Sequence, residues 1–197
     1  MNIFILDQDP ITAAKLQCDK HVVKMIVESA QMLSTAHRML DGVQGIRPSN
    51  SGKRQIKFYD LSIGNNDRPG DIEAELLFYK DVHHNHPCTV WTRESLANYN
   101  WHWEHFRALC EEYKYRYGRY HATHDRLLWP LHIAPTLIPD VGLTPFPLAM
   151  KANPECIFPE DPVKSYRLYY QTKKDRFKMV WSKRSIPEWF NNANVYS

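Results

Sequence analysis

One long helical pattern constrains the fold of this chain more than any other feature. Apolar residues recur at helical spacing from Asp9-Pro10, an N-cap followed by proline in the first turn, to about Leu40. A break is expected near Cys18-Asp19, and Asp41-Gly42 ends the pattern. At about 100° per residue, the polar side chains after the break fall within one arc of about 80°. They are His21, Lys24, Glu28, Gln31 and Thr35. Because a surface helix usually exposes half of its circumference, so narrow an arc predicts a helix packed on most sides.

This polar stripe places an imidazole, an ammonium group and a carboxylate about one turn apart. Such groups are costly on a largely buried helix unless they pair with one another or with a ligand. We therefore interpret the stripe as the best candidate site. His21 and Glu28 are the predicted acid–base pair, since imidazole titrates near neutrality, and Lys24 is a predicted phosphate contact. The alternative is a surface salt bridge between Lys24 and Glu28 on an ordinary amphipathic helix.

Composition narrows the class of protein. The chain has 197 residues, enough for one domain with a core, and its net charge of +3 is too small for a polycation. No GxGxxG or GxxxxGK[ST] motif occurs, which argues against a Gly-rich phosphate loop. Aromatic residues reach 13%, which suits nucleotides or single strands as partners, and equally a well-packed helical protein.

Localisation follows from what the sequence lacks. No apolar run approaches the roughly 18 residues of a membrane span, and the N-terminus has no signal-peptide pattern. The four cysteines are far apart with no CxxC. We expect a cytoplasmic protein with reduced thiols and no membrane partner. The cofactor and the oligomeric state stay unknown at this level.

The predicted fold is mainly α: a single compact helical domain spanning residues 1–197. Three long helices are expected, over residues 9–40, 89–117 and 161–182, the second closed by Gly118 and the third begun by Asp161-Pro162. Residues 3–6 form a short extended segment that enters the core, and residues 71–82 a short helix. Irregular structure is expected over residues 43–71, a loop or insertion, over the Pro-rich residues 119–160, and over a docked tail, 184–197, that contains Trp189 and Phe190.

A second constellation precedes the second long helix. It contains three imidazoles and a thiol, at His83, His84, His86 and Cys88. Such groups bind zinc or other borderline metals, but adjacent histidines in a turn often point apart, so we do not favour a metal site. The alternative to a metal site is an anion site, formed by the free N–H groups at the start of the helix after Pro87. Arg93 would lie one turn further along this helix, and Asn98 would orient a polar ligand.

Two further stretches combine basic and aromatic residues. Residues 113–121 alternate between the two types, which is typical either of base stacking beside phosphate contacts or of basic residues capping a helix end. Here Arg116 is a candidate phosphate contact, and Tyr117 and Trp91 are candidate stacking residues. On the third helix, Lys173 or Lys174 lies where an apolar stripe meets a predicted cleft, within reach of a phosphate.

Several blocks of the sequence resemble a family of proteins from T4-like tailed phages and some bacteria. The blocks span most of the chain: the opening Asp-x-Asp-Pro, Cys18-Asp19-Lys20-His21-Val22-Val23-Lys24-Met25, His86-Pro87-Cys88-x-x-Trp91-x-Arg93-Glu94-Ser95, Tyr115-Arg116-Tyr117-Gly118, Leu143-Thr144-Pro145-Phe146 and Tyr166-Arg167-x-Tyr169-Tyr170. The resemblance implies a phage-encoded protein acting in the host cytoplasm, where nucleotide metabolism, DNA modification and counter-defence are common tasks. It implies no catalytic residue, and residues 43–71 look like an insertion relative to the family.

The sequence therefore predicts an enzyme that cleaves a glycosidic or phosphoester bond of a nucleotide or nucleic-acid component, in a pocket between the three long helices. Two other classes stay open. A non-catalytic binder, which sequesters a nucleotide signal or docks on a host macromolecule, uses the same basic and aromatic groups but returns its ligand unaltered. A metal-dependent hydrolase centred on the histidine turn predicts bound zinc or iron.

Overall fold

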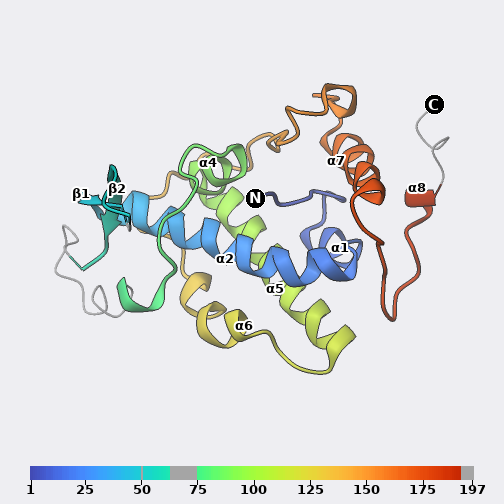
Figure 1. The fold of residues 1–197 in the computed structure, drawn as a ribbon, viewed down its shortest axis with the longest axis horizontal. Coiled ribbons are helices and arrows are strands. Elements are labelled where there is room, and N and C mark those ends of the chain that lie inside the picture. Colours follow the sequence, from blue (N-terminus) through green and yellow to red (C-terminus); the bar gives the residue numbers. More distant parts are fainter. Residues whose placement is uncertain (50, 63–74, 192–197) are drawn as a thin grey trace.

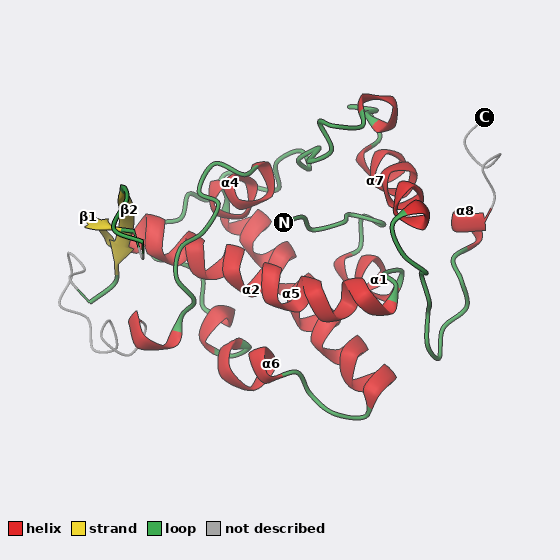
Figure 2. Ribbon diagram, in the orientation of Figure 1, coloured by secondary structure: helices red, strands yellow, loops and turns green. Residues whose placement is uncertain are grey.

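The computed structural model describes residues 1–49, 51–62 and 75–191. Helices dominate the regular structure, which confirms the predicted mainly α class (Figures 1 and 2). The α-helices are α1 (Pro10–Lys15), α2 (Asp19–Asp41), α4 (Pro87–Glu94), α5 (Leu96–Tyr117), α6 (Ala122–Leu127), α7 (Pro162–Gln171) and α8 (Glu188–Asn191). Short 3-10 helices are η1 (Pro130–His132), η2 (Pro154–Cys156) and η3 (Thr172–Asp175), and the strands are β1 (Val43–Pro48) and β2 (Gln55–Asp60). None of the described helices has the length and apolar character that a membrane span needs.

Helices α2 and α5 form the centre of the molecule, where they pack against each other (Figure 1). Fully buried side chains such as Ile26 and Leu33 from α2 and Phe106 and Leu109 from α5 meet in the core. Each such side chain stabilises the fold by about 1.5–3 kcal/mol. Helix α1 packs on α5, and α4 packs on both central helices. Figure 1 shows α7 and α8 near the N-terminal end of α2 and the β1–β2 hairpin beyond its C-terminal end.

The N-terminal segment enters the core, as predicted, without forming a strand. Ile3, Ile5 and Leu6 are fully buried. Between them, Phe4 has a φ of 56°, in the left-handed region, and its ring stacks on His21. A non-glycine residue in that region costs about 1–3 kcal/mol and persists only where the surrounding packing fixes it.

The predicted start and break of the first helical pattern are confirmed. Asp9 caps α1 by accepting a hydrogen bond from the Thr12 N–H at 2.8 Å, and Pro10 occupies the first turn. The chain leaves the helix after Lys15 and begins α2 at Asp19. Helix α2 then runs for 23 residues and ends before Gly42, where the pattern predicts its end.

The second long helix is interrupted, so the prediction of one helix over residues 89–117 is wrong. Ser95 has extended backbone (φ −153°, ψ 149°) and separates α4 from α5. Its Oγ accepts the Ala97 N–H at 3.3 Å and donates to the Gly142 carbonyl at 2.5 Å, so the serine acts as an N-cap inside an apolar pattern. The predicted end is confirmed, because Gly118 has a φ of 75° and caps α5.

The third helix is shorter than predicted. Helix α7 begins after Asp161, as predicted, but ends at Gln171 and tightens into η3, so the continuation to residue 182 is wrong. The Thr172 hydroxyl donates to the Tyr169 carbonyl at 2.7 Å, a local bond that competes with the helical ladder. Between α5 and α7, residues 119–160 are irregular as predicted, apart from α6, η1 and η2.

The C-terminal segment docks on the body, as predicted, up to Asn191. Trp189 and Phe190 are buried, and the Trp181 Nε1–H donates to the Leu16 carbonyl at 2.9 Å. This indole bond holds the chain after α7 against the turn that follows α1.

The largest difference from the sequence prediction is the hairpin. Strands β1 and β2 pair antiparallel, with Val43 opposite Asp60 and Pro48 opposite Gln55, so the loop predicted over residues 43–71 is wrong for these residues. Its remainder from residue 63 lies outside the described residues. A Cβ at position 45 would lie 2.6 Å from the Phe58 ring, so Gly45 permits the pairing.

Arg38 explains why the helix predicted over residues 71–82 does not continue past residue 77. Of its described part only residues 75–77 are helical, and residues 79–86 are irregular apart from a turn. The fully buried Arg38 guanidinium donates to the carbonyls of Tyr59, Glu75, Phe78 and Tyr79 and pairs with the Glu75 carboxylate. These carbonyls are therefore satisfied without a helical ladder.

Candidate functional site

The predicted polar stripe begins at His21, and this imidazole lies in a cage of aromatic rings. It stacks on Phe4, with 4.6 Å between ring centroids, and meets Phe177 edge-on at 5.4 Å. Its Nδ1 lies 2.6 Å from the hydroxyl of Tyr170 on α7. The residue is only 6% exposed, so packing against three aromatic side chains fixes the orientation of the ring.

The contacts of Tyr170 indicate which nitrogen of His21 carries the proton. The hydroxyl accepts the Cys18 N–H at 2.9 Å, and burial raises the pKa of Tyr170 well above its usual value, so the hydroxyl keeps its proton. We infer that it donates this proton to Nδ1, which leaves the imidazole hydrogen on Nε2. Burial, and then the charges of Lys24 and Lys173, lower the pKa of His21 to about 4. At pH 7 the ring is therefore neutral and presents an Nε2–H donor.

Lys173 in η3 presents the most unusual polar group near His21. The residue is 5% exposed, and its Nζ stands 3.4 Å from the centroid of the Tyr169 ring. Within the described part of the chain this ammonium group has no hydrogen-bond acceptor. An unsatisfied buried donor costs about 1–3 kcal/mol, more when charged, and a cation–π contact offsets about 0.5–2 kcal/mol of this. A bound anion would supply the missing acceptor.

Lys24 and Glu28 continue along α2 after His21. The Nζ of Lys24 is 3.1 Å from Oε1 of Glu28, so the ion pair that the sequence offered as an alternative is present. The other oxygen, Oε2, accepts the Asn2 N–H at 3.0 Å and is 3.6 Å from the amino group of Met1. Glu28 thus contacts Lys24 and the N-terminal segment, and stands about 10 Å along the helix from His21.

His21, Lys24 and Lys173 together form a group that we call the cation cluster. It combines a neutral N–H donor, an exposed ammonium group and a buried one, from α2 and η3. The charges of both lysines act on His21 and lower its pKa. Such a set offers charge-assisted hydrogen bonds that an oxyanion could accept.

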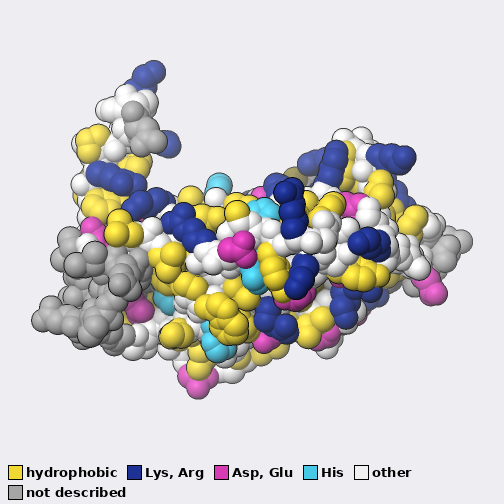
Figure 3. All heavy atoms as spheres, turned by 90° about the horizontal axis from the view of Figure 1, so that it is seen from below, with side chains coloured by type: hydrophobic (Ala, Val, Ile, Leu, Met, Phe, Trp, Pro, Cys, Tyr) yellow, Lys and Arg dark blue, Asp and Glu magenta, His cyan; other side chains and the backbone are white. Residues whose placement is uncertain are grey.

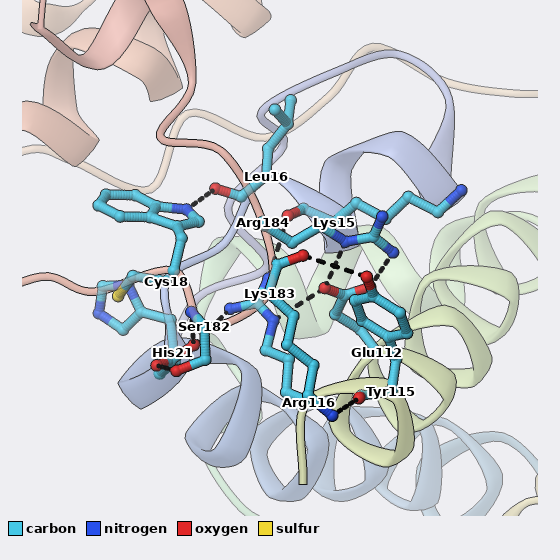
Figure 4. Close-up of polar contacts among 12 residues, drawn as sticks. Lys15, Leu16, Cys18, His21, Glu112, Tyr115, Arg116, Ser182, Lys183 and Arg184 are labelled. Atoms are coloured by element: carbon cyan, nitrogen blue, oxygen red, sulfur yellow. Dashed lines mark hydrogen bonds and ion pairs between the residues drawn. The ribbon is translucent and has the colours of Figure 1, made fainter. Parts of the chain in front are cut away.

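An ion-pair network that the sequence did not predict fixes the start of α2 against α5 and the C-terminal segment (Figure 4). Arg116, a predicted phosphate contact, donates to Asp19 and to Glu112, each at 2.8 Å. Arg184 donates to both oxygens of Glu112, and the Ser182 hydroxyl to Asp19 at 2.6 Å. Burial raises the pKa of Glu112, but hydrogen bonds from Arg184 and Arg116 lower it on balance. Only the i,i+4 spacing of Glu112 and Arg116 was visible in the sequence.

Two predicted binding residues belong to the core instead. Asn98 is fully buried, donating to the Trp91 carbonyl at 2.9 Å and the Thr144 hydroxyl at 2.7 Å while accepting the Thr144 N–H. Trp91 is 2% exposed, and its ring packs against Trp101 and Phe146. Neither side chain presents a free surface to a ligand.

The other predicted contacts are spread over the molecule. Lys174 donates to the Phe190 carbonyl and anchors the C-terminal segment. Tyr117 is 41% exposed, its ring packs on that of Tyr113 with 4.7 Å between centroids, and burial and the charge of Asp19 at the start of α2 raise its pKa. Burial lowers the pKa of Arg93, which interacts with Tyr59 of β2 and so lies toward the hairpin. Arg93 Nη1 has no acceptor among the described residues.

The histidine turn does not converge on one point. Nε2 of His84 lies 2.5 Å from the Asp81 carboxylate, and Nδ1 of His86 accepts the Cys88 N–H as the N-cap of α4. Cys88 is fully buried, and His83 takes a left-handed φ of 49°. Among the described residues, no group of three or more His, Cys, Asp or Glu side chains is arranged to hold a metal ion.

Comparison of the chain with known protein families, with curated proteins and with solved structures gives no match. The site therefore has to be judged on its own geometry. Sequence reasoning assigned no site role to Phe4, Tyr169 and Tyr170, which surround the cation cluster. In the sequence the adjacent tyrosines are singled out only within the Tyr166-Arg167-x-Tyr169-Tyr170 block, and the left-handed backbone of Phe4 leaves no signal there.

Proposed function

We propose that the protein binds the phosphate group of a nucleotide or nucleic-acid component at the cation cluster. The observation that carries this proposal is the Lys173 ammonium group, buried without a hydrogen-bond acceptor within the described residues. An oxyanion beside His21 would accept hydrogen bonds from Lys173, from Lys24 and from the Nε2–H of His21. Ligand binding would then satisfy a group whose burial otherwise destabilises the fold.

The charges of the cluster match a phosphate monoester. Such a group carries about −1.5 to −2 charges at pH 7, and the cluster offers two ammonium groups and one neutral donor. Lys24 also pairs with Glu28, so a bound phosphate and this carboxylate would share the Lys24 ammonium group. The exposed ring of Tyr117, near the start of α2, adds a face on which a base stacks.

The contacts favour binding over turnover. With a pKa of about 4, His21 is a poor proton donor at pH 7, and the Nε2–H tautomer offers no lone pair to a ligand on that nitrogen. Glu28 contacts Lys24 and the N-terminal segment. Cleavage by a His21/Glu28 pair therefore has less support than binding without catalysis.

Calorimetric titration tests this function. The probes are adenosine monophosphate, guanosine monophosphate and inorganic phosphate, titrated into the wild type, Lys173→Met and the exposed control Lys151→Met. We expect at least one probe to bind the wild type and the control equally, and Lys173→Met to lower its affinity at least tenfold. Failure of all three probes to bind the wild type would overturn the proposal.

The same samples distinguish a binder from an enzyme. After incubation the protein is denatured and the nucleotide is analysed by mass spectrometry. Recovery of the intact nucleotide supports binding without turnover. Recovery of a base, a nucleoside or a dephosphorylated product that is absent from a His21→Ala sample would overturn that part of the proposal. It would support cleavage by an enzyme instead.

A further inference from the structure

The β1–β2 hairpin is one of the basic segments of the described structure. Between Val43 and Asp60 the sequence has one carboxylate, Asp60 itself. The cations of the same stretch are Arg47, Lys53, Arg54 and Lys57. Figure 3 shows that this end of the molecule rises as an arm from the body and that Lys and Arg side chains gather on it. We call β1, β2 and the described residues between them the basic arm.

A hollow of about 690 Å³ lies beside the basic arm, and all of its described lining residues except Ile56 are polar or cationic. The lining residues are Arg47, Ser49, Ser51, Lys53, Arg54, Ile56 and Lys80. Lys80, from the body, pairs with Glu75, whereas Arg47 lies over the Phe58 ring at 5.1 Å. Among the described residues that line the hollow there is no carboxylate, so the field of these residues is positive and attracts a polyanion.

Cations lie on both faces of the ribbon. Arg47 pairs with Ile56 and shares the face that lines the hollow, while the next pair, Ile46 and Lys57, points to the opposite face. Ile46 is 66% exposed. Positive charge on two sides of a narrow ribbon matches a ligand that flanks it with two rows of phosphates.

We propose that the basic arm binds duplex nucleic acid through the phosphate backbone. A two-stranded ribbon fits the major groove of B-form DNA, about 12 Å wide, with phosphates on either side. Single strands are a poorer fit, because their binding relies on exposed aromatic platforms, and the only large apolar side chain of the arm that is exposed in the described structure is Ile46.

This site stands apart from the cation cluster. Helix α2 carries His21 near one end and joins the basic arm after its other end, about 30 Å away. The inference therefore goes beyond the proposed function and does not depend on it. Lys173→Met is expected to leave duplex binding unchanged, whereas removing the charges of the arm is expected to leave nucleotide binding unchanged.

Fluorescence anisotropy with a labelled 20-base-pair DNA duplex tests the proposal over a range of salt concentrations. The variant replaces Arg47, Lys53 and Arg54 by glutamine. A matched control removes the same charge elsewhere, at the exposed residues Arg119, Lys151 and Lys178. Thermal melts of both variants verify that they fold.

We expect the arm variant to bind duplex at least tenfold more weakly than the wild type at 0.1 M salt. Its plot of log affinity against log salt should be less steep by about 2.7, since each lost phosphate contact removes about 0.9 from the slope. The control should change affinity less than twofold. Equal losses in the two variants, no duplex binding by the wild type, or tighter binding to the single strand of the same sequence would each overturn the proposal.

Discussion

Replacing Lys173 by methionine is the most informative single change, because it separates a ligand-binding role from a structural one. Methionine matches the four-atom apolar stem of lysine but lacks the terminal ammonium group, which is buried without an acceptor in the described structure. We expect the ligand-free variant to be more stable than the wild type and to lose stabilisation by phosphate ligands. A group that destabilises the empty protein and stabilises the complex is typical of a binding site.

The size of the effect follows from the contacts of Lys173. Removing an unsatisfied buried donor relieves about 1–3 kcal/mol. The lost cation–π contact with Tyr169 costs about 0.5–2 kcal/mol, and a sulfur–aromatic contact restores about 0.3–1.5 kcal/mol. The net expectation is a gain of about 1 kcal/mol, and for a chain of this length each kcal/mol raises Tm by about 2–4 °C.

Thermal unfolding with and without a saturating phosphate ligand provides the readout. At a ligand concentration 100 times Kd, the wild type should gain about 2.7 kcal/mol, and Lys173→Met much less. The exposed control Lys151→Met should stay within about 0.5 kcal/mol of the wild type in both conditions. Destabilisation of ligand-free Lys173→Met by more than about 1 kcal/mol would show that the ammonium group serves the fold, and would refute the reasoning.

Three further predictions concern stability and access. Glu112→Gln should cost about 3–5 kcal/mol in urea unfolding, because it leaves Arg184 without its carboxylate and Arg116 with Asp19 alone. The exposed neighbour Glu111→Gln should cost under about 1 kcal/mol, and similar losses in the two variants would contradict this. Burial lowers the pKa of His37 to about 3, so below pH 6.5 only the unfolded chain takes up that proton. The free energy of unfolding should therefore fall from pH 7 to pH 5, and His37→Gln should reduce this fall by about 2 kcal/mol. The same pH dependence in His37→Gln and the wild type would contradict this. All four cysteines are buried and free, so a thiol reagent should label them quickly only in denaturant, and rapid labelling of the native protein would be evidence against this packing.

The features that the sequence predicted well depend on neighbours in the chain. Asp9 capping α1, Gly118 ending α5 and the start of α7 after Asp161 are decided within one turn by side-chain and backbone chemistry. The narrow polar arc of α2 likewise follows from helical geometry, and the Lys24–Glu28 pair is present on it.

The features that the sequence did not predict depend on distant partners. The region after α2 looked irregular because Gly45 and several cations obscure the alternation of polar and apolar residues in its two strands. The pairing depends on the contact between Gly45 and Phe58, which the sequence does not show. Ser95 interrupts an apolar helical pattern by bonding to Gly142, a residue far along the chain. Glu28 was predicted to act in acid–base chemistry, but its carboxylate accepts a hydrogen bond from Asn2, a residue far from it in the sequence.

The buried guanidinium of Arg38 limits how the basic arm can be altered or reused. Because that one side chain binds the carbonyls of Tyr59 and Tyr79 as well as the Glu75 carboxylate, the base of the ribbon is joined to a segment that is not part of it. A peptide cut at residues 43 and 60 would lose these bonds, and an isolated two-stranded hairpin is marginally stable in water. Transplanting the arm onto another helical scaffold would therefore require an arginine one turn before the end of the supporting helix, together with the segment around residues 75–79.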